Sequence, residues 1–208
     1  MKILLVDFQQ PLIDAWQQAF KNIEDVTVMC HSIFEVPAEA IVSPANSFGY
    51  MDGGLDLRIS QFFGWHVQER LQALIRSKHH GELLVGQAEI VETDSKPIPY
   101  VISAPTMRVP MILGRETINI YLAMRAILLL LKYGTLEDGT EINDVVETVA
   151  IPGMGTGVGR VPPDICAKQM KIAFQEVMEE KYVFPDSWQE AQIRHQLLYS
   201  DNFRDIQY

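Results

Sequence analysis

The chain has 208 residues, 48% hydrophobic and 21% charged, which is enough for one globular domain with a sizeable core. Its formal net charge of −10 disfavours general nucleic-acid binding, since proteins that neutralise a phosphate backbone are normally basic. Two cysteines are too few for a disulfide framework or a cysteine-rich zinc site, and they suit a reducing compartment. The N-terminal sequence lacks a signal peptide's long apolar region, and the most apolar helical run is too short to span a bilayer. We therefore expect a cytoplasmic protein that does not contact membranes.

Segments with strand character alternate with segments of helical periodicity along the chain. Apolar residues at helical spacing predict a first helix, whereas the β-branched run before Pro152 predicts a central strand. This alternation is typical of a three-layer α/β domain with a mixed central sheet. In chain order, the expected strands cover residues 2–8, 26–30, 38–42, 83–92, 100–104 and 145–151, and the expected helices cover 11–23, 55–79, 116–133, 162–181 and 188–198.

The last part of the chain, residues 182–208, follows the final expected strand and helix of this alternating pattern. We expect residues 1–181 to form the domain and residues 182–208 to form a helical extension that packs on it. A tail that binds a partner is the alternative.

The segment 40–60 combines a strand, a turn-rich loop and a helix start. Asn46 lies early in this loop, Gly53 and Gly54 lie just before the helix, and Asp56 lies in its first turn. Glycines at a helix N-terminus allow backbone N–H groups to approach a phosphate closely. The sequence therefore predicts an anion-binding loop with a polar side chain near each end.

A second glycine-rich loop, PGMGTGVGRVPP, follows the expected strand 145–151. Its four glycines alternate with other residues, so the backbone amides can turn inward around an anion, and Thr156 adds a hydroxyl donor. The sequence is neither a P-loop nor a dinucleotide fingerprint, because the lysine and the G-x-G-x-x-G spacing are missing. Two such loops at the C-terminal ends of strands indicate a ligand with a diphosphate, although a plain strand-to-helix connection is the alternative for the second.

Together, the two loops resemble those of macrodomains, the modules that bind ADP-ribose. The first is similar to the family pattern N-A-A-N-x-x-L-x-G-G-G-G-V-D-x-A-I-H, on which Ser43 to Asn46 and Gly53 to Asp56 fall. The second is similar to G-x-G/S-T-G-V/I-[FY]-G-x-P, through Gly153 to Val158 and Pro162. The resemblance covers about residues 2–181 and implies a three-layer macrodomain fold.

The chain departs from the family pattern at several ligand contacts. Ser32 stands where the family often has the aspartate that pairs with adenine, so base preference is expected to be weaker or different. Gly159 replaces the aromatic residue that covers the ribose, and Arg160 replaces the next glycine. Met51 and Asp52 replace two loop glycines, and we expect Asp52 to be a helix N-cap.

The resemblance implies roles for two residues in hydrolysis of an ADP-ribosyl linkage. Asn46 would orient a hydroxyl of the distal ribose, and Asp56 would activate or position water beside the anomeric carbon. The structural alternatives are a turn residue that bonds its own backbone for Asn46 and a helix first-turn acid for Asp56. The implied ligand-binding residues are Ser32, Ile33, Ala45, Gly53, Gly54, Leu55, Gly153, Gly155, Thr156, Gly157, Val158, Gly159 and Arg160.

The histidines, arginines and aromatic residues give weaker indications of a functional site. The five histidines have no metal-ligand spacing, so we expect neither a metal site nor a cofactor. Arg108, Arg115 and Arg160 are candidate phosphate contacts, whereas Trp65 and the pair Phe62–Phe63 are expected in the core. The sequence thus predicts a protein that binds ADP-ribose, or an ADP-ribosylated substrate, and hydrolyses its linkage. A non-catalytic module that senses ADP-ribose or a related nucleotide is the alternative, a scaffold role is a third, and the oligomeric state stays open.

Overall fold

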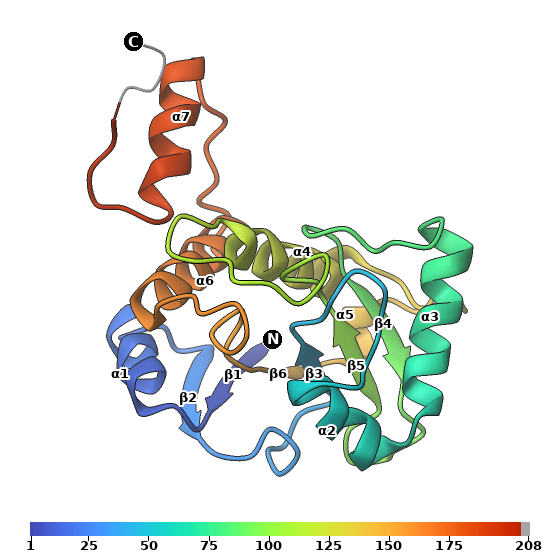
Figure 1. Cartoon of the computed structure of the whole chain (residues 1–208). Coiled ribbons are helices and arrows are strands. Elements are labelled where there is room, and N and C mark those ends of the chain that lie inside the picture. The colour runs from blue at the N-terminus through green and yellow to red at the C-terminus, as the bar shows by residue number, and fades with distance from the viewer. Residues whose placement is uncertain (205–208) are drawn as a thin grey trace.

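The computed structural model describes residues 1–204 and shows a central sheet between two layers of helices (Figure 1). The sheet has six strands in the order β2-β1-β6-β3-β5-β4, and only β4 runs antiparallel to its neighbour. The three-layer α/β fold with a mixed sheet is therefore confirmed. The strands are β1 (Lys2–Asp7), β2 (Val26–Cys30), β3 (Ala40–Ser43), β4 (Glu89–Glu92), β5 (Tyr100–Ser103) and β6 (Thr148–Ile151). The helices are α1 (Gln10–Ala19), α2 (Gly54–Phe63), α3 (His66–Lys78), α4 (Asn119–Tyr133), α5 (Ile142–Val145), α6 (Pro163–Val177) and α7 (Trp188–Leu197).

Alternate residues of each central strand enter two separate hydrophobic cores. In β1, Leu5 packs under α1, α4 and α6, whereas Leu4 and Val6 pack under α2 and α3. This period of two follows from the pleat, and burial on both faces is what parallel strands require. The C-terminal ends of the five parallel strands therefore meet at one edge of the sheet, and the loops that leave this edge carry the predicted site.

The expected helix over residues 55–79 was wrong, because the chain breaks at Gly64 into α2 and α3. Gly64 has a φ of +110°, which L residues with side chains rarely adopt. A Cβ atom there would also lie 2.7 Å from Nδ1 of His66. The same turn leaves Phe62 and Trp65 about half exposed, at 54% and 48%, so their expected place in the core was wrong.

Two expected strands are shorter than the sequence indicated. Only Glu89–Glu92 of the segment 83–92 pairs with β5, because the N–H of Gln87 donates to the carbonyl of Leu84 in a turn. Similarly, the first residues of the segment 145–151 close the short helix α5, and β6 begins at Thr148.

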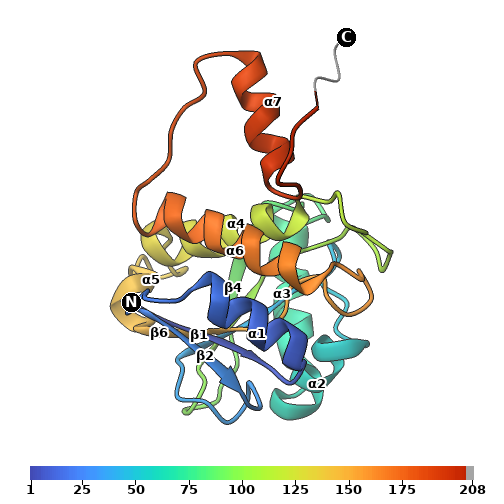
Figure 2. The ribbon, with the colours of Figure 1, turned by 90° about the vertical axis from the view of Figure 1, so that its left-hand side faces the viewer.

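The segment after Lys181 stands apart from the sheet, with α7 on the outer side of α4 and α6 (Figure 2). Lys168 of α6 donates to the carbonyl of Ser200 and to the carboxylate of Asp201, and Tyr199 packs against the first hydrophobic core. These contacts join the segment to α6, and the division into a domain of residues 1–181 and a packed extension stays a prediction. Residues 205–208 of the predicted extension lie outside the described residues. Within residues 1–204, no helix has the length and apolar character needed to cross a membrane.

Candidate active site

A cavity of about 540 Å³ lies where the loops leave the C-terminal ends of the parallel strands. Both glycine loops line it, as does the segment after β2. This is the edge at which open α/β sheets bind ligands. All predicted site residues line the cavity except Arg160: Ser32, Ile33, Ala45, Asn46, Gly53, Gly54, Leu55, Asp56, Gly153, Gly155, Thr156, Gly157, Val158 and Gly159.

The side chain of Asn46 holds the first loop in shape. Its Oδ1 accepts from the backbone N–H of Phe48 (3.1 Å) and of Tyr50 (3.3 Å), and its Nδ2 donates to the carbonyl of Tyr50 (2.7 Å). This is the turn structure that was the alternative to a ligand contact. An amide nitrogen has two N–H groups, so one donor of Asn46 is left for a ligand.

The carboxylate of Asp56 is the most strongly perturbed acid of the cavity. It lies in the first turn of α2, and its Oδ1 accepts from the hydroxyl of Ser43 at the end of β3. Desolvation by burial raises the pKa of Asp56 to about 6; the hydrogen bond from Ser43 opposes this rise, and the charge of Asp52 adds to it. A carboxylate with this pKa inside a cavity is suited to general-base catalysis at neutral pH.

Asp52 lines the cavity as an exposed carboxylate rather than capping α2. The N-cap residue is Gly53, and no side chain caps this helix end, so the expected N-cap at Asp52 was wrong. Among residues 1–204, the first N–H groups of α2 are therefore left without a side-chain cap, at the positive end of the helix dipole.

Asp7, at the end of β1, supports the second glycine loop. Its Oδ2 accepts from the N–H of Gly153 (3.1 Å), and its Oδ1 accepts from the N–H groups of Phe8 (2.8 Å) and Gln9 (3.0 Å). Asp7 was not among the predicted site residues, although an acidic residue at the end of a buried strand was a usable signal. Because these contacts span the β1 and β6 ends, Asp7 fixes the second loop relative to the sheet.

Gly159 has no room for a side chain in this loop. A Cβ atom would lie 2.5 Å from the carbonyl oxygen of Gly155, and the Gly159 carbonyl accepts from the N–H of Leu113 (2.9 Å). The loop conformation thus explains why no aromatic residue stands here. Arg160, with a φ of +53°, is exposed and is not among the cavity-lining residues.

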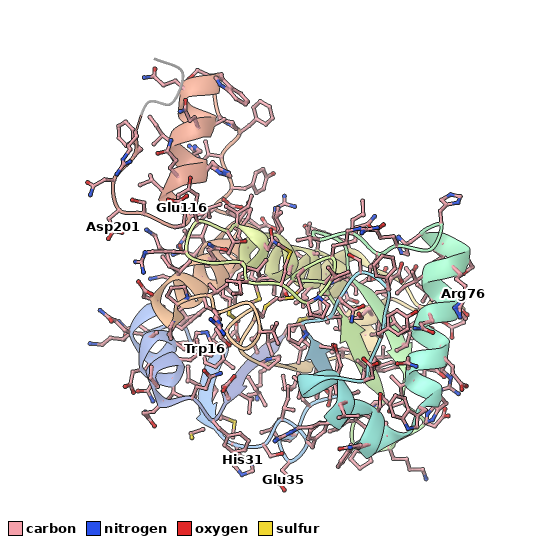
Figure 3. All side chains as sticks on the ribbon, in the orientation of Figure 1. Trp16, His31, Glu35, Arg76, Glu116 and Asp201 are labelled. Atoms are coloured by element: carbon pink, nitrogen blue, oxygen red, sulfur yellow. The ribbon has the colours of Figure 1, made fainter. Side chains whose placement is uncertain are left out.

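The segment after β2 forms the other end of the cavity. Ser32 Oγ accepts weakly from the N–H of Phe34 (3.4 Å), and the Phe34 ring stacks on Phe62 with centroids 4.7 Å apart. Figure 3 places His31, which is in the same segment, near Glu35. Nδ1 of His31 lies 3.7 Å from Oε2 of Glu35. In the same view, Asp201 of the C-terminal extension lies at the opposite end of the molecule.

None of the three arginines that were candidate phosphate contacts lines the cavity. Arg108 pairs with Glu82 (2.6 Å) and Arg115 with Asp164 (2.9 Å), and neither lines the cavity. Arg58 of α2, which was not predicted, does line the cavity. Of the two cysteines, Cys166 is buried, whereas Cys30 is exposed.

Comparison with known proteins agrees with the resemblance of the two loops to those of macrodomains. The sequence model of the Macro domain matches residues 42–170. An uncharacterized protein of Aquifex aeolicus is 35% identical over 146 residues, which cover 70% of this chain and 78% of that protein. An uncharacterized protein of Aeropyrum pernix is 31% identical over 148 residues, which cover 71% of this chain and 69% of that protein.

Solved macrodomains share the fold. The macrodomain of Mycobacterium tuberculosis DarG superposes with a TM-score of 0.57 at 21% identity, over 72% of this chain and 90% of that chain. A mutant of the Oceanobacillus iheyensis macrodomain with ADPR gives a TM-score of 0.59 at 18% identity, over 81% of this chain and 86% of that chain. The chain belongs to the macrodomain family.

Proposed function

We propose that this protein binds ADP-ribose in the cavity between its two glycine loops and hydrolyses an ADP-ribosyl linkage. Membership of the macrodomain family supports the binding part, as does the ADPR in the Oceanobacillus iheyensis structure. The cavity volume of about 540 Å³ lies within the range of small-molecule sites.

The diphosphate of the ligand fits between the two loops. On one side, the N-terminus of α2 presents N–H groups around Gly53 and Gly54 that no described side chain caps, at the positive end of the helix dipole. On the other side, the loop from Gly153 to Gly159 curves around the cavity and is anchored by Asp7. Backbone donors from both sides supply anion binding in a chain whose net charge is −10.

The single observation that supports hydrolysis is the carboxylate of Asp56. It lies in the cavity with a pKa of about 6, so it is mainly ionised at neutral pH yet basic enough to accept a proton. Such a carboxylate can deprotonate an attacking water and stabilise positive charge on the anomeric carbon of the ribose. General-base catalysis of this kind typically contributes about 10²–10⁴-fold to the rate.

Asn46 is assigned a supporting part in this proposal. Most of its hydrogen-bonding capacity is used within the first loop, through Phe48 and Tyr50. Its remaining N–H group would donate to a hydroxyl of the distal ribose. Asn46 would thus shape the loop and contact the ligand with the same side chain.

A sensor without catalysis is the second candidate function. Ser32 lacks the carboxylate that many macrodomains use at the base, and Gly159 lacks the aromatic cover of the ribose. Tight binding of ADP-ribose without turnover would favour this candidate.

Hydrolysis by the wild type, Asp56→Asn and Asp52→Asn decides between the two. The substrates are an ester-linked ADP-ribosyl peptide, an ether-linked one and ADP-ribose 1″-phosphate. Asp52 is the matched control, because it is a neighbouring carboxylate that also lines the cavity. We expect Asp56→Asn to lose at least about 100-fold in rate while it still binds ADP-ribose, and Asp52→Asn to lose less than about tenfold. Equal turnover by Asp56→Asn and the wild type would refute the catalytic assignment.

A further inference from the structure

A buried serine lies beneath the N-terminal end of α2, which carries Asp56. Ser43 is the last residue of β3, it is fully buried, and its hydroxyl donates to Oδ1 of Asp56. Its backbone is fixed by the sheet, because its carbonyl accepts from the N–H of Ala104 (3.0 Å) and its register partner is Ser103 of β5. The hydroxyl is therefore held on a rigid strand rather than on a loop.

The carboxylate of Asp56 has no other hydrogen-bond donor among residues 1–204. Its Oδ1 is occupied by Ser43, and its Oδ2 is left open for a ligand or a water. The backbone of α2 is held separately, since Ser60 Oγ donates to the carbonyl of Met51 (2.8 Å) and Ile59 is fully buried. The helix thus fixes where the carboxylate is, and Ser43 is the donor within residues 1–204 that orients it.

We propose that Ser43 is a positioning residue for Asp56, which turns Oδ1 towards the sheet and leaves Oδ2 as the atom that meets the ligand. The consequence for hydrolysis rests on the proposed function, whereas the orientation of the carboxylate does not. Ser43 touches no ligand in this proposal and acts only through Asp56.

The hydroxyl also affects the pKa of Asp56. Burial favours the protonated acid, and the hydrogen bond from Ser43 opposes burial by stabilising the ionised form. Without the hydroxyl, only the terms that raise the pKa remain, so the acid would titrate closer to or above neutral pH. Hydrogen bonds to charged groups are strong enough for their loss to raise the pKa of Asp56 by about one unit or more.

Ser103 provides a matched control on the neighbouring strand. It is fully buried like Ser43, it is the register partner of Ser43, and its hydroxyl has no hydrogen-bond partner among the described residues. Replacing either serine by alanine removes the same atom from an equally buried strand end. Only the Ser43 change removes a donor from Asp56.

The test is a ¹³C NMR titration of the Asp56 carboxyl in the unliganded full chain. We expect Ser43→Ala to raise the pKa of Asp56 by about one unit or more, and Ser103→Ala and Ser43→Thr, which keeps the hydroxyl, to leave it near the wild-type value. No shift in Ser43→Ala, or equal shifts in both alanine variants, would overturn the proposal. If Ser43→Ala does not fold, Ser43→Cys carries the same test, since a thiol is only a weak donor.

Kinetics then separate positioning from a merely structural effect. In Ser43→Ala the acidic limb of the pH–rate profile should move up with the pKa of Asp56, and the plateau at high pH should stay below that of the wild type, because the ionised carboxylate is no longer held in one orientation. An unmoved limb together with an unchanged plateau would contradict positioning. If the wild type hydrolyses no substrate, the proposed function fails while the NMR titration still decides the part of Ser43.

Discussion

Gly159→Ala is expected to disrupt the second loop, whereas Gly157→Ala in the same loop is expected to be tolerated. A Cβ atom at Gly159 would lie 2.5 Å from the backbone carbonyl oxygen of Gly155, and backbone cannot move away as a flexible side chain can. At Gly157, no atom lies within 4 Å of an added Cβ. The Gly159 change must therefore shift the turn in which Val161 N–H donates to Gly155 (3.0 Å).

Overpacking a well-packed site typically costs about 1–3 kcal/mol. For a domain of this size, each kcal/mol lowers the midpoint of thermal unfolding by about 2–4 °C, so Gly159→Ala should lose roughly 2–12 °C. Thermal unfolding followed by circular dichroism measures this loss, and calorimetry with ADP-ribose measures the loss of affinity that should accompany it. Equal melting midpoints for the Gly159 and Gly157 variants would refute the reasoning about the loop.

Three further changes follow from the same contacts. Because the pKa of Asp56 is about 6 in the folded chain, against 3.8 as its ordinary value, the folded state holds that proton more tightly. Urea unfolding should therefore show the wild type gaining about 2 kcal/mol relative to Asp56→Asn as the pH falls from 7 to 4, and a constant difference would contradict this. Asn46→Ala removes the hydrogen bonds to Phe48 and Tyr50 and should cost about 1–2 kcal/mol in the same assay, so an unchanged midpoint would count against the loop-holding role. Deleting the residues after Lys181 should leave ADP-ribose affinity within about twofold, because all cavity-lining residues precede Arg160, and a large loss of affinity would be evidence against this placement.

The two glycine loops were predictable because their signals are local. Each combines a buried strand, a run of glycines and a helix start within about twenty residues, and this pattern dictates backbone donors at the edge of a sheet. The resemblance to macrodomains rested on the same stretches. The structure brings both loops to one cavity, and the family match over residues 42–170 agrees.

The contacts that join the loops to the rest of the domain were not predictable from spacing. Asp7 and Gly153 are far apart in the sequence and meet only because β1 and β6 are neighbours in the sheet. Likewise, Ser43 and Asp56 meet because α2 packs over the end of β3. The first pair depends on strand order and the second on how α2 packs over β3, and no local pattern encodes either.

The helix break at Gly64 had a local signal that helical periodicity concealed. The apolar spacing continues across the break, so the pattern favoured one helix, while Gly64 adopts a positive φ between α2 and α3. The exposure of Phe62 and Trp65 follows from this turn and was missed with it.

The central claim is that ADP-ribose occupies the cavity between the two loops, and isothermal titration calorimetry tests it most directly. We expect ADP-ribose to bind the full wild-type chain saturably, with one molecule per chain, and AMP to bind at least about tenfold more weakly because it lacks the second phosphate and the distal ribose. Saturable ADP-ribose binding with this preference is the predicted result. No saturable binding at millimolar ADP-ribose, or equal affinity for AMP, would contradict the account.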